Sequence, residues 1–214
     1  MIRLAPSKII AVGRNYAAHA RELGNEVPAQ PMLFLKPPSS LVGPGEPIVL
    51  PAVSGRVEFE AEIGVVIGRR LRNVSLEEAE RGIRGFVCVN DVTARDLQKV
   101  DGQWGRAKGF DTFCPAGPSV VDGLDWRRLE VIGRVNGAVR QRAPASDMVF
   151  PIPELVRYIA GIMTLEPGDL IATGTPAGTG PLAPGDVVEV EIPGVGVLRN
   201  PVVAESRALN PRAS

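Results

Sequence analysis

The stretch Val57-Glu58-Phe59-Glu60-Ala61-Glu62-Ile63-Gly64-Val65-Val66-Ile67 alternates glutamates with apolar residues before it becomes entirely apolar. This period of two predicts a strand, with Glu58, Glu60 and Glu62 on one face. Carboxylates this close repel one another, and each is driven to take up a proton unless a cation neutralises the group or water screens it. A divalent metal ion would neutralise the group.

The alternative is a solvent-facing strand whose outer side chains are glutamates without a further role. Two observations favour the metal site. The acidic face continues into Gly64 and Val66, which indicates a strand that runs from an acidic mouth into a core, and Asp91 follows a second apolar run, 85–90. Three oxygen ligands from two neighbouring strands, with positions left for water and substrate, suit Mg²⁺ or Mn²⁺.

Composition excludes several classes of function. The 214 residues, 44% of them hydrophobic and 22% charged, are enough for a substantial core, and we favour one domain over two small ones. Lys plus Arg, 24, equals Asp plus Glu, 24, so no net field attracts nucleic acid or an anionic membrane. We expect neither as a partner.

The same features point to the cytoplasm. The two cysteines, Cys88 and Cys114, make no disulfide framework and are compatible with a reducing compartment. No apolar run approaches the roughly 20 residues of a membrane span, and the N-terminus lacks a signal-peptide pattern.

Glycine and proline are spread along the whole chain and predict many short strands. The predicted strands are 8–13, 32–36, 48–50, 56–67, 85–91, 129–135 and 186–192, with 197–203 pairing back on the last of them. Asn136-Gly137 predicts a hairpin with a type I′ turn.

Three helices are predicted. A capping box from Ser75 to Glu78 starts one over 76–83, and a shorter one spans 16–23. Another follows Pro151, because Ile152, Leu155, Ile159 and Ile162 recur at helical spacing. The sum is a mainly β chain with peripheral helices (α+β), with a single catalytic domain over 1–205 and a flexible C-terminal tail over 206–214.

The one histidine of the chain, His19, stands three residues before Glu22 on the helix 16–23, so the two side chains share a face. A carboxylate beside an imidazole fixes its tautomer and raises its basicity, which suits a water-activating base. An ordinary surface pair on a solvated helix is the alternative interpretation. Because Gly24, Asn25 and Pro28 follow, the segment 14–30 could be a lid that closes over a site.

Several motifs occur together in a fixed order. They are Gly13-Arg14-Asn15-Tyr16 with His19 and Glu22, Phe34-Leu35-Lys36-Pro37, the run 60–68, Asn90-Asp91-Val92-Thr93-Ala94-Arg95-Asp96, Lys108-Gly109-Phe110-Asp111, and the glycine-rich segment 174–180. With these motifs, the chain resembles the fumarylacetoacetate hydrolase family over most of its length. The resemblance implies a mixed β-roll of the type of the family's C-terminal domain, and a homodimer of the compact branch of acylpyruvate hydrolases and oxaloacetate decarboxylases.

The resemblance also implies three groups of site residues. They are the Mg²⁺ or Mn²⁺ ligands Glu60, Glu62 and Asp91, the catalytic residues His19, Glu22 and Lys108, and the substrate-binding residues Arg14, Gln98 and Thr175. Glu58 stands where many members have Asp and stays outside the ligand set.

The expected substrate is a small oxo acid. A 2-oxo acid chelates the cation through its carboxylate and keto oxygens, and cleavage between C3 and C4 leaves an enolate whose charge a metal can stabilise. Hydrolysis of acylpyruvates or related 2,4-diketo acids also needs an activated water, whereas decarboxylation of oxaloacetate does not. A hydrolase therefore remains beside a decarboxylase or an isomerase of the 2-hydroxyhepta-2,4-diene-1,7-dioate type. A binder without turnover would not need the dyad.

Two motifs carry no separate function. Segment 174–180 lacks the Lys-Ser/Thr ending of a phosphate loop and is interpreted as a turn with close backbone approach. Nothing near Cys114 indicates a thiol nucleophile.

Overall fold

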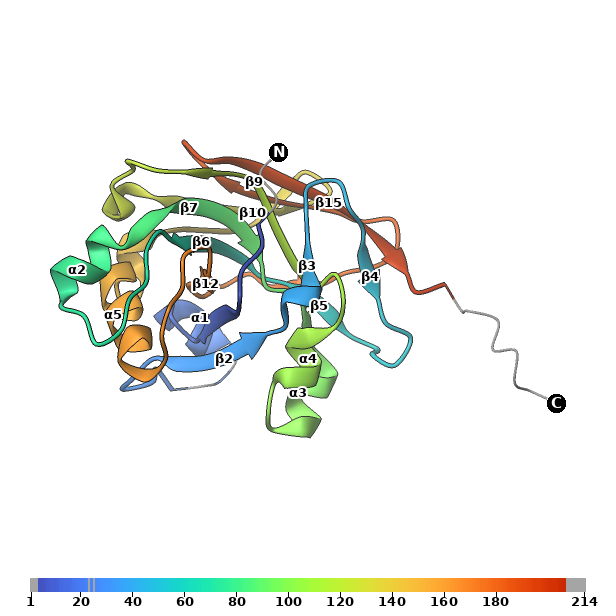
Figure 1. Ribbon diagram of the computed structural model, residues 1–214. Helices are drawn as coiled ribbons and strands as arrows, with labels where there is room; N and C mark the ends of the chain where they lie inside the picture. Colours follow the sequence, from blue (N-terminus) through green and yellow to red (C-terminus); the bar gives the residue numbers. More distant parts are fainter. Residues whose placement is uncertain (1–3, 23, 25, 207–214) are drawn as a thin grey trace.

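A seven-stranded and a five-stranded β-sheet pack face to face in the computed structural model, which describes residues 4–22, 24 and 26–206 (Figure 1). Seven strands form the larger sheet, in the order β2-β1-β12-β6-β7-β9-β3. Their bounds are β2 (Met32–Lys36), β1 (Ile9–Gly13), β12 (Leu170–Ala172), β6 (Ala61–Ile67), β7 (Ile83–Asn90), β9 (Cys114–Val121) and β3 (Leu41–Val42). The sheet is mixed, because β1 runs parallel to β12 and antiparallel to β2.

Two smaller sheets complete the β structure. The five-stranded sheet has the order β11-β10-β14-β15-β4 and the three-stranded sheet the order β13-β5-β8. Their bounds are β11 (Ala138–Pro144), β10 (Glu130–Val135), β14 (Val187–Ile192), β15 (Gly196–Ala204), β4 (Ile48–Leu50), β13 (Gly180–Pro181), β5 (Val57–Phe59) and β8 (Thr93–Ala94). Both predicted hairpins are confirmed, since β10 pairs with β11 and β14 with β15. Asn136 and Gly137 have φ of 53° and 78°, as a type I′ turn requires.

The prediction of one continuous strand over 56–67 was wrong. Glu60 separates β5 from β6, which belong to different sheets. The backbone N–H of Glu60 donates to Asn90 Oδ1 at 2.9 Å, so a side chain takes the place of a ladder partner where the chain changes sheet. This side-chain contact leaves no periodic signal in the sequence.

The alternation itself is confirmed, because the two faces of β6 enter different environments. Ala61, Ile63, Val65 and Ile67 join the core between the two larger sheets. Val66 lies in a second core on the opposite face of the seven-stranded sheet. The glutamates therefore lie at the start of β6, and the rest of the strand is packed on both faces.

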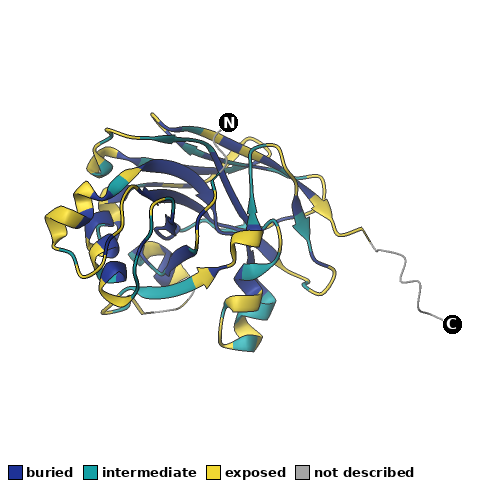
Figure 2. Cartoon of the chain, in the orientation of Figure 1, coloured by how far each residue is buried: buried dark blue, intermediate teal, exposed yellow. Residues whose placement is uncertain are grey.

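In the described part of the chain, five α-helices lie around the sheets: α1 (Ala17–Glu22), α2 (Leu76–Arg81), α3 (Arg95–Asp101), α4 (Gly105–Gly109) and α5 (Ile152–Ile162). Helices α2 and α5 pack on each other at one end of the molecule, while α3 and α4 lie side by side below the sheets (Figure 1). The central strands are buried and the outer faces of the helices are exposed (Figure 2). The fold is thus mainly β with peripheral helices, as predicted.

The helix predictions held in three places and failed in two. The capping box at Ser75 is present, and α5 buries Ile152, Leu155 and Ile159, although Ile162 is exposed. Helices α3 and α4 were not predicted. They have seven and five residues, and neither has a side-chain cap that would signal its start.

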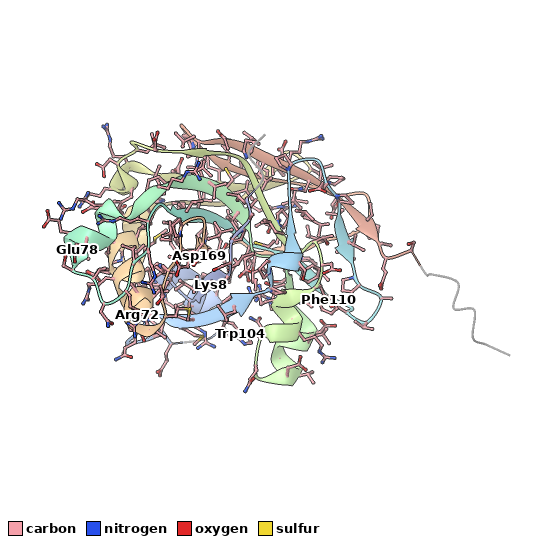
Figure 3. All side chains as sticks on the ribbon, in the orientation of Figure 1. Lys8, Arg72, Glu78, Trp104, Phe110 and Asp169 are labelled. Carbon is pink, nitrogen blue, oxygen red and sulfur yellow. The ribbon has the colours of Figure 1, made fainter. Side chains whose placement is uncertain are left out.

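Asp169 fastens the start of β1 to the turn before β12 (Figure 3). Its Oδ1 accepts hydrogen bonds from the backbone N–H groups of Ser7 and Lys8, and the Lys8 ammonium pairs with its Oδ2. The carboxylate is fully buried. This ion pair lies outside the candidate site.

Two predicted segments extend beyond the described residues. The flexible tail 206–214 falls outside them except for residue 206, and the helix predicted over 16–23 ends at Leu23, which is also outside them. The single domain over 1–205 stays a prediction. Among the described residues, no helix combines the length and the apolar character of a membrane span.

Candidate active site

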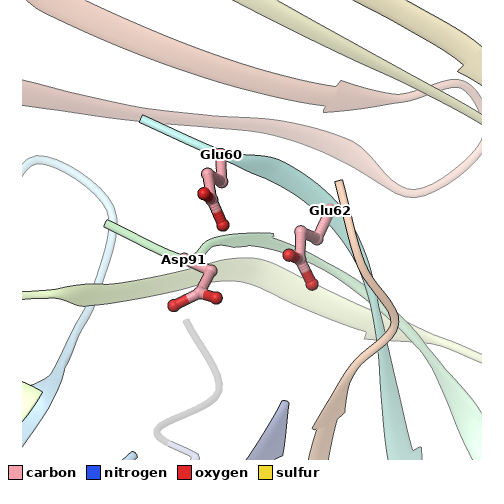
Figure 4. A group of neighbouring side chains, drawn as sticks. All are labelled: Glu60, Glu62 and Asp91. Carbon is pink, nitrogen blue, oxygen red and sulfur yellow. The ribbon is translucent and has the colours of Figure 1, made fainter. Parts of the chain in front are cut away.

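Three carboxylates meet where β6 begins and β7 ends (Figure 4). The antiparallel register sets Ala61 opposite Asn90, and the backbone N–H of Asp91 donates to the Glu60 carbonyl at 2.9 Å. One oxygen each from Glu60, Glu62 and Asp91 lies within 4.8 Å of the others. Their exposed fractions are 4%, 1% and 1%, so the residues form a buried acidic cluster.

A fixed donor holds one oxygen of each carboxylate in this cluster. The three contacts are Arg95 Nη2 to Glu60 Oε1 at 2.5 Å, Lys36 Nζ to Asp91 Oδ1 at 2.6 Å, and the Gly174 N–H to Glu62 Oε2 at 2.8 Å. A second oxygen of each group remains for the space that the carboxylates share. Three carboxylate oxygens are the hard donors that Mg²⁺ and Mn²⁺ prefer, so the residues fit such an ion.

Lys108, on α4, already places a cation beside two of these oxygens. Its Nζ lies 2.7 Å from Glu60 Oε2 and 2.6 Å from Asp91 Oδ2, and the side chain is buried. Burial alone would lower the pKa of Lys108, but the carboxylates of Asp91 and Glu60 outweigh it and raise the pKa. The ammonium therefore stays charged in the neutral range.

The nearby cations do not lower the pKa of every carboxylate in the cluster. Burial would raise the pKa of Glu60, yet Lys108 and Arg95 lower it below the ordinary value. The pKa of Glu62 is instead raised well above the ordinary value by burial and by the charges of Asp91 and Glu60. The hydrogen-bond donor that Glu62 contacts among the described residues is the neutral Gly174 N–H, whereas Glu60 and Asp91 are paired with lysine and arginine side chains.

Glu58 shares the acidic face without joining the cluster. It accepts from Arg56 Nε at 2.7 Å and from Arg95 Nε at 2.8 Å. Burial would raise its pKa, but Arg95 outweighs that effect and lowers it. Arg95 therefore bridges Glu58 and Glu60, and arginine side chains donate to both oxygens of Glu58.

The pair on α1 faces the same cavity. His19 Nδ1 lies 3.2 Å from Glu22 Oε2, and the Gly178 N–H lies 3.1 Å from each Glu22 carboxylate oxygen. Only 4% of His19 is exposed, so the interpretation as an ordinary surface histidine was wrong. With Nδ1 against the carboxylate, Nε2 is the nitrogen left to act on another molecule.

All the residues that the sequence singled out for the site line one cavity of about 440 Å³. They are Arg14, His19, Glu22, Glu60, Glu62, Asp91, Gln98, Lys108 and Thr175. Gln98 accepts from Arg95 Nη1 at 2.7 Å. The Thr175 hydroxyl donates to the Ala61 carbonyl at 3.0 Å, which ties the glycine-rich segment to β6.

Two aromatic side chains form part of the cavity wall, and the Lys108 ammonium lies over one of them, 5.0 Å from the Phe34 ring centroid. Phe34 and Trp104 meet edge to face with centroids 5.2 Å apart, and both line the cavity. A Cβ at Gly13 would lie 2.8 Å from the Trp104 ring, so this glycine leaves room for the indole. Trp104 is thus part of the cavity wall.

Three supporting residues were missed from the sequence: Lys36, Arg95 and Gln141. Lys36 and Gln141 are each 1% exposed, and Arg95 is 5% exposed. Gln141 accepts from the Ala61 N–H at 2.9 Å and donates to Thr175 Oγ1 at 2.7 Å. A signal was present for Lys36, a lysine that directly follows the apolar run 32–35.

A family model, curated relatives and solved structures all match this chain over most of its length. Residues 8–203 match the family model described as fumarylacetoacetate (FAA) hydrolase C-terminal. A relative from Dictyostelium discoideum named mitochondrial oxaloacetate decarboxylase is 45% identical over 196 residues, which cover 88% of this chain and 89% of that protein. The crystal structure of 2-hydroxyhepta-2,4-diene-1,7-dioate isomerase from Mycobacterium marinum is 48% identical, with a TM-score of 0.88 over 95% of this chain and 77% of that one.

A third similar protein carries a metal. The crystal structure of fumarylpyruvate hydrolase from Pseudomonas aeruginosa, in complex with Mn²⁺ and pyruvate, is 32% identical and has a TM-score of 0.89. The match covers 94% of this chain and 91% of that one.

Proposed function

The chain belongs to the fumarylacetoacetate hydrolase family, and we propose that it is a divalent-metal-dependent hydrolase that cleaves the bond between C3 and C4 of acylpyruvates or related 2,4-diketo acids. The observation that carries this proposal is the presence of the acidic cluster and the His19–Glu22 pair at one cavity. A cation site and a general base are the two components that this hydrolysis needs.

Glu60, Glu62 and Asp91 would hold the ion, which we propose is Mg²⁺ or Mn²⁺. When bound, the ion would supply Lewis-acid stabilisation for the negative charge that develops on the pyruvate fragment. The Mn²⁺ in the fumarylpyruvate hydrolase structure supports this assignment, as does the grouping of three buried carboxylates with one oxygen each within 4.8 Å of the others.

His19 is the proposed base. Its Nε2 takes a proton from water while Glu22 stabilises the imidazolium through Nδ1. The hydroxide adds to C4, the C3–C4 bond breaks, and its electron pair stays with the pyruvate fragment as an enolate. The proton held by His19 then returns to C3, so the products are a carboxylic acid and pyruvate and the histidine is restored.

The remaining cations at the cavity suit an anionic substrate. Lys108 supplies a buried positive charge at the cavity, and we assign it to the oxyanion that forms at C4. Arg14, Arg56 and Lys99 line the outer part of the cavity. We propose that they attract the substrate's carboxylate.

A second candidate is decarboxylation or isomerisation of oxaloacetate-like oxo acids at the same site. The names of the 45% identical relative and of the 48% identical structure favour it. Decarboxylation needs stabilisation of an enolate but no attacking water, so the dyad has less to do in that reaction.

The test is a panel of acylpyruvates, fumarylpyruvate, oxaloacetate and unsaturated dicarboxylic oxo acids, each assayed with Mg²⁺, with Mn²⁺ and with a chelator. The proposal expects metal-dependent release of pyruvate from acylpyruvates. Turnover of oxaloacetate or the unsaturated acids alone would favour the second candidate, and turnover that survives the chelator would remove the metal from either.

The assembly is also a proposal. On the family resemblance we propose a homodimer of single-domain subunits that binds a small oxo acid and neither nucleic acid nor membrane. Light scattering on the purified protein measures its molar mass, and a mass of one subunit, 22.7 kDa, would contradict the dimer.

A further inference from the structure

We infer that Lys36 is a positioning residue that leaves Asp91 only its Oδ2 for a metal ion and thereby keeps a coordination position open for the substrate. The inference rests on the proposed metal site and goes beyond it, because it concerns a residue that touches neither the ion nor the substrate. Lys36 does not line the cavity.

The burial of Lys36 is the first observation. Its side chain is 0% exposed at the end of β2, which is an edge strand of the seven-stranded sheet. A buried ammonium is costly unless it is paired and its donors are satisfied. A lysine retained at such a position therefore needs specific partners.

Every donor of that ammonium has a partner. Nζ lies 2.6 Å from Asp91 Oδ1, 2.5 Å from the Lys108 carbonyl and 3.3 Å from the Val92 carbonyl. The three partners come from the segment after β7 and from α4. Lys36 thus joins the loop that carries Asp91 to the helix that carries Lys108.

The two oxygens of Asp91 consequently differ. Oδ1 faces Lys36, whose stem is enclosed and whose ammonium is tied to two backbone carbonyls. Oδ2 faces Lys108 Nζ, which lines the cavity at the end of a long side chain. A metal ion at Oδ2 would displace the Lys108 contact, whereas a metal ion at Oδ1 would displace an ammonium that is also tied to two backbone carbonyls and has no cavity to move into.

The number of coordination positions on the ion explains why one oxygen from Asp91 matters. Mg²⁺ and Mn²⁺ take about six oxygen ligands. One oxygen from each of three carboxylates leaves about three positions, of which a 2-oxo acid needs about two for its carboxylate and keto oxygens. If Asp91 were free to bind through both oxygens, it would compete with the substrate for one of these positions.

The experiment compares Lys36→Met with the wild type and with Lys8→Met. Methionine keeps an unbranched buried stem and removes the charge. Lys8 is the matched control, because it also pairs with a buried aspartate, Asp169, but away from the cavity.

Electron paramagnetic resonance measures the Mn²⁺ affinity, and water-proton relaxation measures the number of water molecules on the bound ion. A third measurement is the affinity of the Mn²⁺-loaded protein for oxalate, which chelates a metal ion as an enolpyruvate does. For Lys36→Met we expect Mn²⁺ binding to persist, with about one water fewer on the ion and oxalate bound at least ~10-fold more weakly. Lys8→Met should match the wild type in all three.

The outcomes separate the two proposals. A wild type that binds no Mn²⁺ removes the proposed function itself. A folded Lys36→Met with wild-type water number and wild-type oxalate affinity overturns only the role of Lys36. Should Lys36→Met not fold, a crystal structure of the Mn²⁺-loaded wild type decides the matter: Asp91 bound through Oδ2 alone supports the inference, and Asp91 bound through both oxygens overturns it.

Discussion

Replacement of His19 by alanine tests the division of labour between the dyad and the acidic cluster. His19 Nδ1 lies 3.2 Å from Glu22 Oε2, and His19 is not one of the three residues of the acidic cluster. The substitution therefore removes the proposed base and leaves the cation site in place. Hydrolysis of acylpyruvates should fail, while decarboxylation of oxaloacetate, where it occurs, should largely persist.

The two reactions should differ in how far kcat falls. A positioned general base contributes about 10²- to 10⁴-fold, so kcat for hydrolysis should fall by that factor, which corresponds to about 3–5 kcal/mol in the barrier. Decarboxylation does not use the water, so its kcat should change by less than ~10-fold. Because His19 is buried and contacts Glu22, its truncation should cost the fold about 1–3 kcal/mol, which circular dichroism of the purified variant would show as a lower Tm.

Steady-state assays of both substrates at saturating Mg²⁺ give the two ratios, with Mn²⁺ affinity measured on the same samples. Arg21→Ala, at an exposed position of the same helix, controls for general effects on α1. Equal loss of both activities, with the metal still bound, would falsify the reasoning, since it would mean that His19 acts in a step common to both reactions.

Three further predictions concern other parts of the molecule. Asp91→Asn should weaken Mg²⁺ binding by at least ~10-fold in calorimetry, and unchanged affinity would remove Asp91 from the ligand set. Burial would raise the pKa of Asp169, but backbone donors and Lys8 outweigh burial and hold the pKa below the ordinary 3.8. The ionised carboxylate therefore stabilises the fold above pH 3.8, and this stabilisation is lost as the pH falls through the lower pKa of the folded state. In urea unfolding, Asp169→Asn should cost about 1–3 kcal/mol at pH 7 and less below pH 4. Burial raises the pKa of Cys88 and Cys114 to about 12, so iodoacetamide at pH 8 should modify both only after unfolding, and rapid labelling of the native protein would contradict their burial.

The sequence predicted much of the site because local periodicity places side chains on faces. Alternation along 57–67 was enough to put Glu60 and Glu62 on one face, and an apolar run that ends at Asp91 was enough to suggest the neighbouring strand. The spacing of His19 and Glu22 likewise predicted their contact on one helix. Each of these inferences needs only residues that are close in sequence or strands that pair as neighbours.

The supporting contacts could not be predicted in this way, because they join distant parts of the chain. Lys36 reaches Asp91 across 55 residues, Arg95 reaches Glu60 across 35, and Gln141 reaches Ala61 across 80. No period links such positions. The break of the strand at Glu60 has the same origin, since the Asn90 side chain that causes it lies 30 residues away.

The acidic cluster also shows why crowded carboxylates in a sequence do not by themselves require a metal. A lysine can neutralise them, and Lys108 lies within hydrogen-bond distance of both Glu60 and Asp91. Glu62 distinguishes the two cases, because a backbone N–H holds one of its oxygens and burial and its acidic neighbours raise its pKa. Among the described residues, Lys108 and Arg95 pair with Glu60, and Lys108 and Lys36 pair with Asp91, whereas Glu62 accepts from the neutral Gly174 N–H. A divalent ion placed among the three would give Glu62 the cationic partner that the other two already have.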